Sequence, residues 1–167
     1  AESDKVHLAK ICVEVAQATD LDNISIVRRP NGKISDSTAI SGLLVDREKS
    51  HHNMPDSVSD AKIALISVDI SLPEFAKSVQ VQVHDNTAVQ DFIESRKEQL
   101  QAIGESILAS GTNVIFCMRD IDAFIQEYFA KMGVYAARRV AKSDLEALSK
   151  ATGARLISNI DNMNESD

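Results

Sequence analysis

The hydrophobic positions in the second half of the chain alternate between two spacings. Asn113–Cys117 is a short apolar run, which is typical of a buried strand. From Asp120 to Met132 the apolar residues recur at helical spacing, and Gly133 ends that pattern. Val134–Ala137 is again short and apolar, and a further helix and strand are indicated before residue 158. This alternation predicts an α/β fold in which parallel strands are joined by right-handed crossovers.

The last of these predicted helices carries signals at both ends. Ser143 and Glu146 have the spacing of a capping box at its start. Gly153 stands where a left-handed C-terminal cap is expected.

The first half of the chain shows weaker patterns. Val6–Ala18 carries an apolar stripe at helical spacing, with nothing nearby in the sequence to bury it. Asn23–Val27 and Ile40–Asp46 alternate or cluster as short strands do, on either side of a turn. Asp60–Asp69 is the most continuous apolar segment of this half, so we expect it at the centre of a sheet.

A strand and a long helix are indicated between these two halves. Ser78–His84 alternates regularly, as a strand with one wet face does. From Val89 to Ile107 a helical stripe continues to a Ser-Gly pair, with Gly104 as a candidate bend. A helix of about 23 residues would reach roughly 35 Å, more than a small sheet needs for cover. We therefore expect part of it to project.

Composition narrows the function classes. The net charge of −7 and the pI near 5.1 argue against a nucleic-acid backbone or an anionic membrane as the main partner. No apolar run approaches the roughly 20 residues of a membrane span, and no signal segment is seen, so we expect a soluble, cytoplasmic protein. Cys12 and Cys117 lie in apolar contexts, which favours buried free thiols over a disulfide.

No motif for catalysis or metal binding stands out. The two common phosphate-binding glycine loops are absent, and no Ser or Cys has a convincing neighbouring base. The adjacent His51 and His52 point in different directions on most backbones, so we expect a loop there and no metal site. Asp120 and Asp122 could be paired carboxylates. The helix that follows favours instead an N-cap role for Asp120, with Asp122 in the first turn.

One compact basic cluster remains, formed by Arg138, Arg139 and Lys142. It lies between a predicted strand and a helix N-terminus, where an anion could bind. The alternative is ion pairing with the abundant acidic residues of the chain. A doubly wound enzyme that binds a small molecule or phosphate at this corner is a second possible function, although it would need a glycine loop that is not found.

Several short stretches, which together span nearly the whole chain, have the order and spacing of a known protein family. They are Leu8-Ala-Lys-Ile-Cys-Val-Glu14, Gly42-Leu-Leu-Val-Asp-Arg-Glu48, Met54-Pro55, Asp60-Ala-Lys-Ile-Ala-Leu65, Ser110-Gly-Thr-Asn-Val114, Ala130-Lys131, Gly133, Arg138-Arg-Val140, Lys142-Ser-Asp144 and Lys150-Ala-Thr-Gly-Ala154. As a set they resemble the apical domain of the group II chaperonins, the family of the archaeal thermosome and its eukaryotic cytosolic relatives.

The resemblance implies a fold and a domain plan. The fold would be a mixed layered α/β apical domain, with a central βαβαβ unit, a β-rich half and a long-helix protrusion. Residues 1–20 would be a remnant helix of the intermediate domain and residues 21–167 the apical domain, with the protrusion at about 71–103. The chain would be an excised or separately made apical piece, because the family's last apical strands and its equatorial domain fall outside it.

The resemblance also implies a function. Such domains bind non-native polypeptides, and the protrusion forms the built-in lid of an ATP-driven chamber made by neighbouring subunits in a double ring. ATP and Mg would bind the absent equatorial domain, so this chain would hold no cofactor, no metal and no catalytic residue. A protein-interaction module that is not a chaperone is a further alternative.

Two sets of site residues follow from the resemblance. The client groove would use the outer face of the helix at 120–132 and the base of the long helix: Asp122, Ala123, Gln126, Glu127, Ala130, Gln101, Glu105 and Leu108. The lid would expose apolar residues of the protrusion: Leu72, Phe75, Val89, Phe92 and Ile93. The alternative for the first set is a merely solvated helix face. The family commonly has Gly-Ile-Asp-Asp and a His-Tyr pair where this chain has Asp120-Ile-Asp-Ala123 and Glu127-Tyr128, on the proposed client face.

Overall fold

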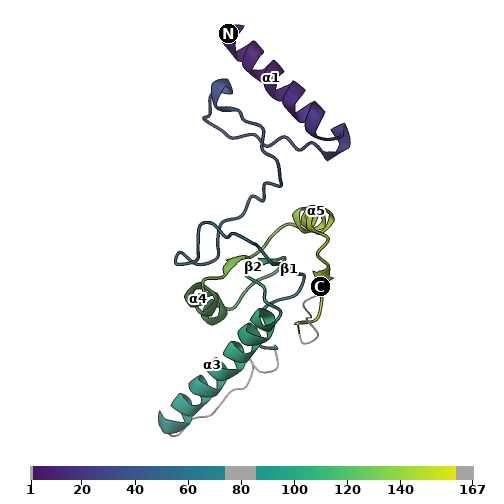
Figure 1. Ribbon diagram of the computed structural model, residues 1–167. Helices are drawn as coiled ribbons and strands as arrows, with labels where there is room; N and C mark the ends of the chain where they lie inside the picture. Colours follow the sequence, from purple (N-terminus) through teal and green to yellow (C-terminus); the bar gives the residue numbers. More distant parts are fainter. Residues whose placement is uncertain (1, 74–85, 161–167) are drawn as a thin grey trace. The chain divides into compact units, whose positions relative to one another are not determined.

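Four parallel strands between residues 63 and 157 form a single sheet (Figure 1). They are β1 (Ile63–Ile66), β2 (Val114–Cys117), β3 (Tyr135–Ala137) and β4 (Leu156–Ile157), in the order β3-β2-β1-β4. Ile63 pairs with Val114, Val114 with Tyr135, and Leu65 with Leu156. The predicted α/β class and the parallel pairing are confirmed.

The computed structural model describes residues 2–73 and 86–160, with the side chains of 86–89 left undescribed. Its backbone contacts divide the chain into two compact units, Ala1–Leu44 and Val45–Asp167. The predicted boundary between an intermediate-domain remnant and an apical domain stays a prediction. The predicted strand at Ser78–His84 lies outside the described residues.

Helices cover both faces of the sheet. One face carries α3 (Asn86–Ala109) and α4 (Ala123–Lys131), and the other carries α5 (Lys142–Thr152). Side chains of neighbouring strand residues point to opposite faces, so Ile66 belongs to the core under α3 and α4 while Leu65 packs with Leu145 and Leu148 of α5. The result is a three-layer arrangement with the sheet in the middle.

Helix α3 is the long helix that the apolar stripe predicted. Its 24 residues span about 36 Å at about 1.5 Å per residue. Leu100 and Ile107 are buried near its base, whereas residues 90–95 and 97–99 are exposed. The helix continues through Gly104 to Ala109, and the bend expected at that residue stays a prediction.

The ends of α5 differ from the sequence prediction in one respect. The expected capping box at Ser143 and Glu146 is wrong, since the N-cap is Ala141 and no side chain caps the helix. Gly153 closes the helix with a φ of 78°, so the predicted left-handed cap is confirmed.

The first unit contains α1 (Glu2–Ala18) and two short 3-10 helices, η1 (Leu21–Asn23) and η2 (Ile34–Asp36). His7 Nε2 lies 2.8 Å from the carbonyl oxygen of Ser37, and no residue of α1 is buried. The predicted strands at Asn23–Val27 and Ile40–Asp46 are wrong, because those residues pair with no other strand. A strand needs a neighbouring strand to pair its backbone groups, and these segments have none within residues 2–73 and 86–160.

The two cysteines are both free, as predicted, but only Cys117 is buried. Cys12 is exposed on α1, so the expectation of a buried thiol there is wrong. Of the helices in residues 2–73 and 86–160, none combines the length and the apolar character that crossing a bilayer requires.

Candidate functional site

The residue that caps the N-terminus of α4 (Ala123–Lys131) is not the one that the sequence predicted. Asp122 is the N-cap, and its Oδ1 accepts a hydrogen bond from the backbone N–H of Phe124 at 2.9 Å. The predicted N-cap, Asp120, lies two residues earlier and uses its carboxylate in ion pairs instead. The N-cap of α4 therefore lies two residues later in the chain than predicted.

The inner side of α4 is core, as its apolar stripe predicted. Ile125 and Phe129 are fully buried, and Phe124 and Tyr128 are partly buried against the same cluster. Gln126 was expected on the exposed face, and this is wrong. It is only 7% exposed, and its Nε2 donates to the carbonyl oxygen of Ile121 at 2.6 Å.

The outer side of α4 borders a shallow hollow, which we call the α4 hollow. It has a volume of about 290 Å³. Its lining comes from a loop before β1 and from the outer face of α4: His51, His52, Asn53, Glu127, Ala130 and Lys131. Glu127 and Ala130 belong to the predicted client face, whereas the loop residues were not predicted to belong to any site.

A buried side chain and two hydrogen bonds hold the loop of the α4 hollow in place. Met54 is buried in the core, and its carbonyl oxygen accepts a hydrogen bond from Lys49 Nζ at 2.8 Å. The Ser50 N–H donates to the carbonyl oxygen of Ala136 at 2.7 Å. The rings of His51 and His52 lie 4.4 Å apart at 31°, so the expectation that they point in different directions is wrong.

The charges around the α4 hollow are of mixed sign. Glu127 and Lys131 form an ion pair at 2.8 Å. The hydrogen bond from Lys131 lowers the pKa of the Glu127 carboxyl, and the charges of Lys131, His51 and Lys97 act in the same direction. Across the described parts of the chain, no three His, Cys, Asp or Glu side chains are placed to hold a metal ion. The α4 hollow thus offers hydrogen-bonding and apolar contacts of the kind found in protein interfaces.

The other predicted client residues lie elsewhere on the same unit. Asp122 caps α4 and lies 3.5 Å from an Arg96 guanidinium nitrogen of α3, while Ala123 is exposed. Gln101 and Glu105 are exposed on α3 and joined by a hydrogen bond of 2.8 Å. Leu108 is partly buried against the core. None of these five lines the α4 hollow.

The predicted lid residues differ in their exposure to solvent. Leu72 was expected to be exposed, and this is wrong, because it is 7% exposed and belongs to the main core. Phe92 and Ile93 are each 39% exposed on α3, in keeping with the expectation. The side chains of Phe75 and Val89 lie outside the described residues.

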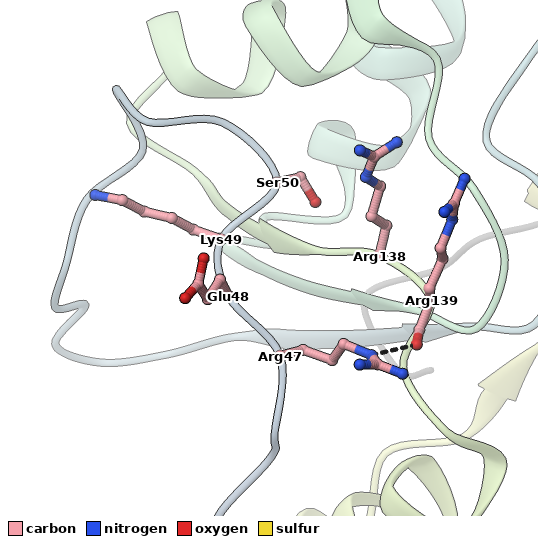
Figure 2. Close-up of a pocket in the computed structure, with 6 residues that line it drawn as sticks. All are labelled: Arg47, Glu48, Lys49, Ser50, Arg138 and Arg139. Carbon is pink, nitrogen blue, oxygen red and sulfur yellow. Dashed lines mark hydrogen bonds between the residues drawn. The ribbon is translucent and has the colours of Figure 1, made fainter.

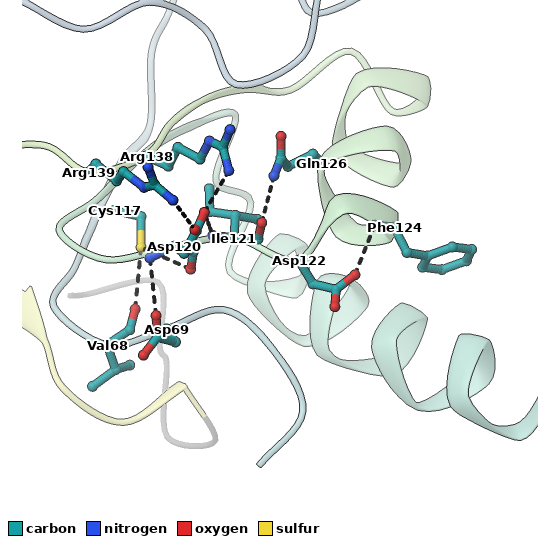
Figure 3. A network of polar contacts seen from close by, with 10 residues as sticks. All are labelled: Val68, Asp69, Cys117, Asp120, Ile121, Asp122, Phe124, Gln126, Arg138 and Arg139. Carbon is teal, nitrogen blue, oxygen red and sulfur yellow. Dashed lines mark hydrogen bonds and ion pairs between the residues drawn. The ribbon is translucent and has the colours of Figure 1, made fainter. Parts of the chain in front are cut away.

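A polar network closes the carboxyl edge of the sheet (Figure 3). Asp120 accepts from Arg138 at 2.8 Å and from Arg139 at 2.7 Å. Its backbone N–H donates to Asp69 Oδ1 at 3.1 Å. The two guanidinium groups, Arg139 first, hold the pKa of the Asp120 carboxyl at about 2. With the Lys142–Glu146 pair at 3.6 Å, the ion-pairing interpretation of the basic cluster is confirmed.

Comparisons with known proteins agree with this architecture. A profile of the TCP-1/cpn60 chaperonin family matches residues 1–167, and the chain therefore belongs to this family. It is 39% identical over 155 residues to thermosome subunit beta of Methanothermobacter thermautotrophicus, covering 93% of this chain and 29% of the relative. It is 40% identical over 147 residues to thermosome subunit alpha of Thermoplasma acidophilum, covering 88% of this chain and 27% of the relative.

A solved structure gives the same result. The open-state monomer of a group II chaperonin from Methanococcoides burtonii matches with a TM-score of 0.70 and 38% identity, covering 89% of this chain and 31% of that one. The predicted resemblance to group II chaperonins is confirmed. The chain spans less than a third of the length of these relatives.

Proposed function

We propose that this chain is the polypeptide-binding apical portion of a group II chaperonin subunit. The observation that carries the proposal is the α4 hollow, where the loop of His51, His52 and Asn53 meets the outer face of α4 in a chain of this family. Non-native polypeptide would bind along this hollow. Ala123, exposed at the start of α4, would extend the contact surface.

The chemistry of the α4 hollow suits a polypeptide better than a small substrate. It is shallow, and it combines imidazole rings, an amide, an ion pair and a small apolar side chain. A surface of this kind makes hydrogen bonds and modest apolar contacts with many sequences, which favours partly folded clients over a single ligand shape. Enzyme pockets are typically deeper and more apolar.

The enzyme alternative has less support. In an open parallel sheet with strand order 3-2-1-4, a ligand would bind beyond the carboxyl ends of β1 and β4. There the Ser67 backbone N–H and hydroxyl both donate to the carbonyl oxygen of Ile157, at 2.9 and 3.0 Å. No glycine loop follows β1.

The remaining parts of the proposal concern the whole assembly. The outer part of α3 would belong to a lid protrusion, with Phe92 and Ile93 among its exposed apolar residues. ATP and Mg would bind a region of the subunit beyond this chain, and neighbouring subunits would complete a double ring in the cytoplasm. The isolated chain would then bind no ATP, and titration calorimetry with Mg-ATP would give no saturable heat.

A charge reversal with a matched control tests the α4 hollow. Glu127→Arg places a cation in the hollow, and Glu146→Arg makes the same change on α5. Both glutamates are exposed and both pair with a lysine four residues away. We expect Glu127→Arg to weaken binding of a labelled, chemically denatured test protein about three- to tenfold, while Glu146→Arg binds as the unaltered chain does. Both variants should keep the melting temperature.

Two results would count against this proposal. Unchanged binding in folded Glu127→Arg would remove the α4 hollow as the client site. Equal binding of the native form of the test protein would favour an interaction module over a chaperone.

A further inference from the structure

A second hollow, which we call the basic hollow, lies beside the α4 hollow on the same loop. It has a volume of about 320 Å³. Its lining comes from the loop before β1 and from the segment after β3 (Figure 2): Arg47, Glu48, Lys49, Ser50, Arg138 and Arg139. Four positive side chains and one carboxylate therefore surround this space, in a chain whose net charge is −7.

The positive charges differ in how far they are neutralised. Lys49 pairs with Asp56, and Figure 2 shows its side chain extending away from the two arginines that follow β3. Arg138 and Arg139 share a single carboxylate, and their side chains remain 41% and 68% exposed. Each guanidinium carries five N–H donors, so both can donate to a further acceptor. The basic hollow therefore keeps an excess of positive charge.

Arg47 adds a cation that forms no ion pair within the described residues. Its Nε donates to the carbonyl oxygen of Arg139, and its Nη1 donates to the carbonyl oxygen of Asp46 at 3.3 Å. The bond to Arg139 joins the loop to the segment after β3 and holds the guanidinium at the rim of the hollow (Figure 2). Carbonyl partners orient an arginine while leaving its charge available to an anion.

A hydroxyl group completes the basic hollow. The Ser50 Oγ is buried and has no hydrogen-bond partner in the described parts of the chain. In Figure 2 it points toward Arg138. A buried hydroxyl that makes no hydrogen bond is unfavourable by about 1–3 kcal/mol, so such groups call for a partner. An oxyanion seated between Ser50 and the arginines would accept hydrogen bonds from both.

We propose that the basic hollow is a subsite for carboxylate side chains of a polypeptide bound in the α4 hollow. The inference rests on the proposed function, because the two hollows are lined by consecutive residues, 47–50 and 51–53, of one loop. A polypeptide lying along that loop reaches both. The subsite selects clients with Asp or Glu next to the segment that contacts α4.

The test uses the full 167-residue chain and two labelled peptides, identical except that one carries glutamates where the other carries glutamines. Fluorescence anisotropy at low salt should show the glutamate peptide binding about two- to fivefold more tightly, which is the range of one or two exposed ion pairs. Raising the salt concentration should reduce this preference, because these charges are open to solvent.

Substitutions locate the preference. Arg47→Gln should reduce it, because Arg138 and Arg139 keep their charges, while the glutamine peptide still binds. Ser50→Ala keeps every charge and should reduce the preference, so it tests the hollow even if Arg47→Gln fails to fold. Lys150→Gln removes one positive charge from α5, outside the basic hollow, and should leave the preference intact.

The outcomes separate this subsite from the proposed function. If the glutamine peptide binds but the two peptides bind equally, only the subsite is overturned. A preference that is undiminished in both Arg47→Gln and Ser50→Ala would also overturn it. If neither peptide binds the unaltered chain, polypeptide binding fails and the subsite fails with it. An effect of Glu127→Arg on both peptides alike would support the α4 hollow alone.

Discussion

Gly104 of α3 lies directly against the ring of Tyr128 of α4. A Cβ atom added at Gly104 would stand 2.8 Å from Cδ1 and 3.1 Å from Cε1 of that ring. Real Cβ atoms do not approach other atoms so closely, and a glycine in a helix is unfavourable by about 1 kcal/mol relative to alanine. The glycine therefore allows α3 to pack closely on α4.

Gly104→Ala should destabilise the chain in spite of alanine's better helix propensity. Overpacking in a well-filled site is unfavourable by about 1–3 kcal/mol, against a gain of about 1 kcal/mol from propensity. We expect the free energy of unfolding in urea to fall by about 1 kcal/mol. In a Tyr128→Ala background the same substitution should instead stabilise the chain. Destabilisation in both backgrounds would contradict the contact as the cause.

Strands β2 and β3 could be predicted from the sequence because each lies between two helices of clear period. Asn113–Cys117 and Val134–Ala137 are short apolar runs typical of buried strands, and the helix between them requires a parallel crossover. Asn23–Val27 shows how such reasoning fails. This segment alternates between polar and apolar residues as a strand does. A strand also depends on a partner strand, which the local sequence does not reveal.

The site was only partly predictable for the same reason. Gln126 and Glu127 are neighbouring polar residues on one helix, and nothing in their spacing tells which is buried. The difference arises from the carbonyl group of Ile121, which accepts the Gln126 amide. The approach of His51 to α4 is likewise a tertiary contact. In the sequence, the nearest feature to His51 that was singled out was Met54-Pro55, and it was cited only for its resemblance to the family.

Gln126 and Glu127 provide a matched pair for stability. Gln126→Ala removes a buried hydrogen bond and leaves the carbonyl oxygen of Ile121 without that donor, so we expect a loss of about 1–2 kcal/mol. Glu127→Ala removes an exposed side chain and should leave the melting temperature nearly unchanged. Thermal melts of the two variants compare them directly. Equal melting temperatures would place Gln126 at the surface.

Asp120 should contribute to stability in a defined pH window. Its pKa falls from 3.8 to about 2 on folding, because Arg139 and Arg138 donate to the carboxylate. A lowered folded-state pKa stabilises the chain above the unfolded value, and this contribution is lost as pH falls from about 4 to 2. Since the side chain is 43% exposed, we expect about 1 kcal/mol or less.

Asp120→Asn tests this dependence. The variant should be less stable than the unaltered chain at pH 7, and the difference should shrink toward pH 2. Urea denaturation at several pH values measures it. Asp144→Asn on α5 removes a carboxylate that forms no ion pair within the described residues, and it should not reproduce the effect. A difference between Asp120→Asn and the unaltered chain that stays constant across this range would show that the two ion pairs are not its source.

The two thiols should differ sharply in reactivity. Burial raises the pKa of the Cys117 thiol to about 12, although backbone hydrogen bonds with Arg119 and Ile70 oppose the shift. Cys12 is exposed. Because the thiolate is the reactive form, one thiol should react quickly with Ellman's reagent at pH 8 and the second only after denaturation. Cys12→Ser should abolish the fast phase. A fast phase that persists would mean that Cys117 is accessible.

The two halves of α3 should differ in hydrogen exchange. Near its base, Leu100 and Ile107 are buried in the core and Gly104 contacts Tyr128. In the outer half, residues 90–95 and 97–99 are exposed, and Arg96 forms a 3.5 Å ion pair with Asp122. Most helix stability in proteins comes from packing of an apolar face, so the outer half can open without the base.

Amides of residues 91–98 should therefore exchange at least about tenfold faster than those of residues 103–109, with the amides of β2 as the slow reference. Exchange followed by mass spectrometry with short overlapping peptides resolves the two halves. Arg96→Ala removes the outer pair and should speed exchange in the outer half while leaving the base unchanged, because the base depends on the core. Uniform protection along α3, equal to that of β2, would contradict a projecting helix and remove the structural support for a lid.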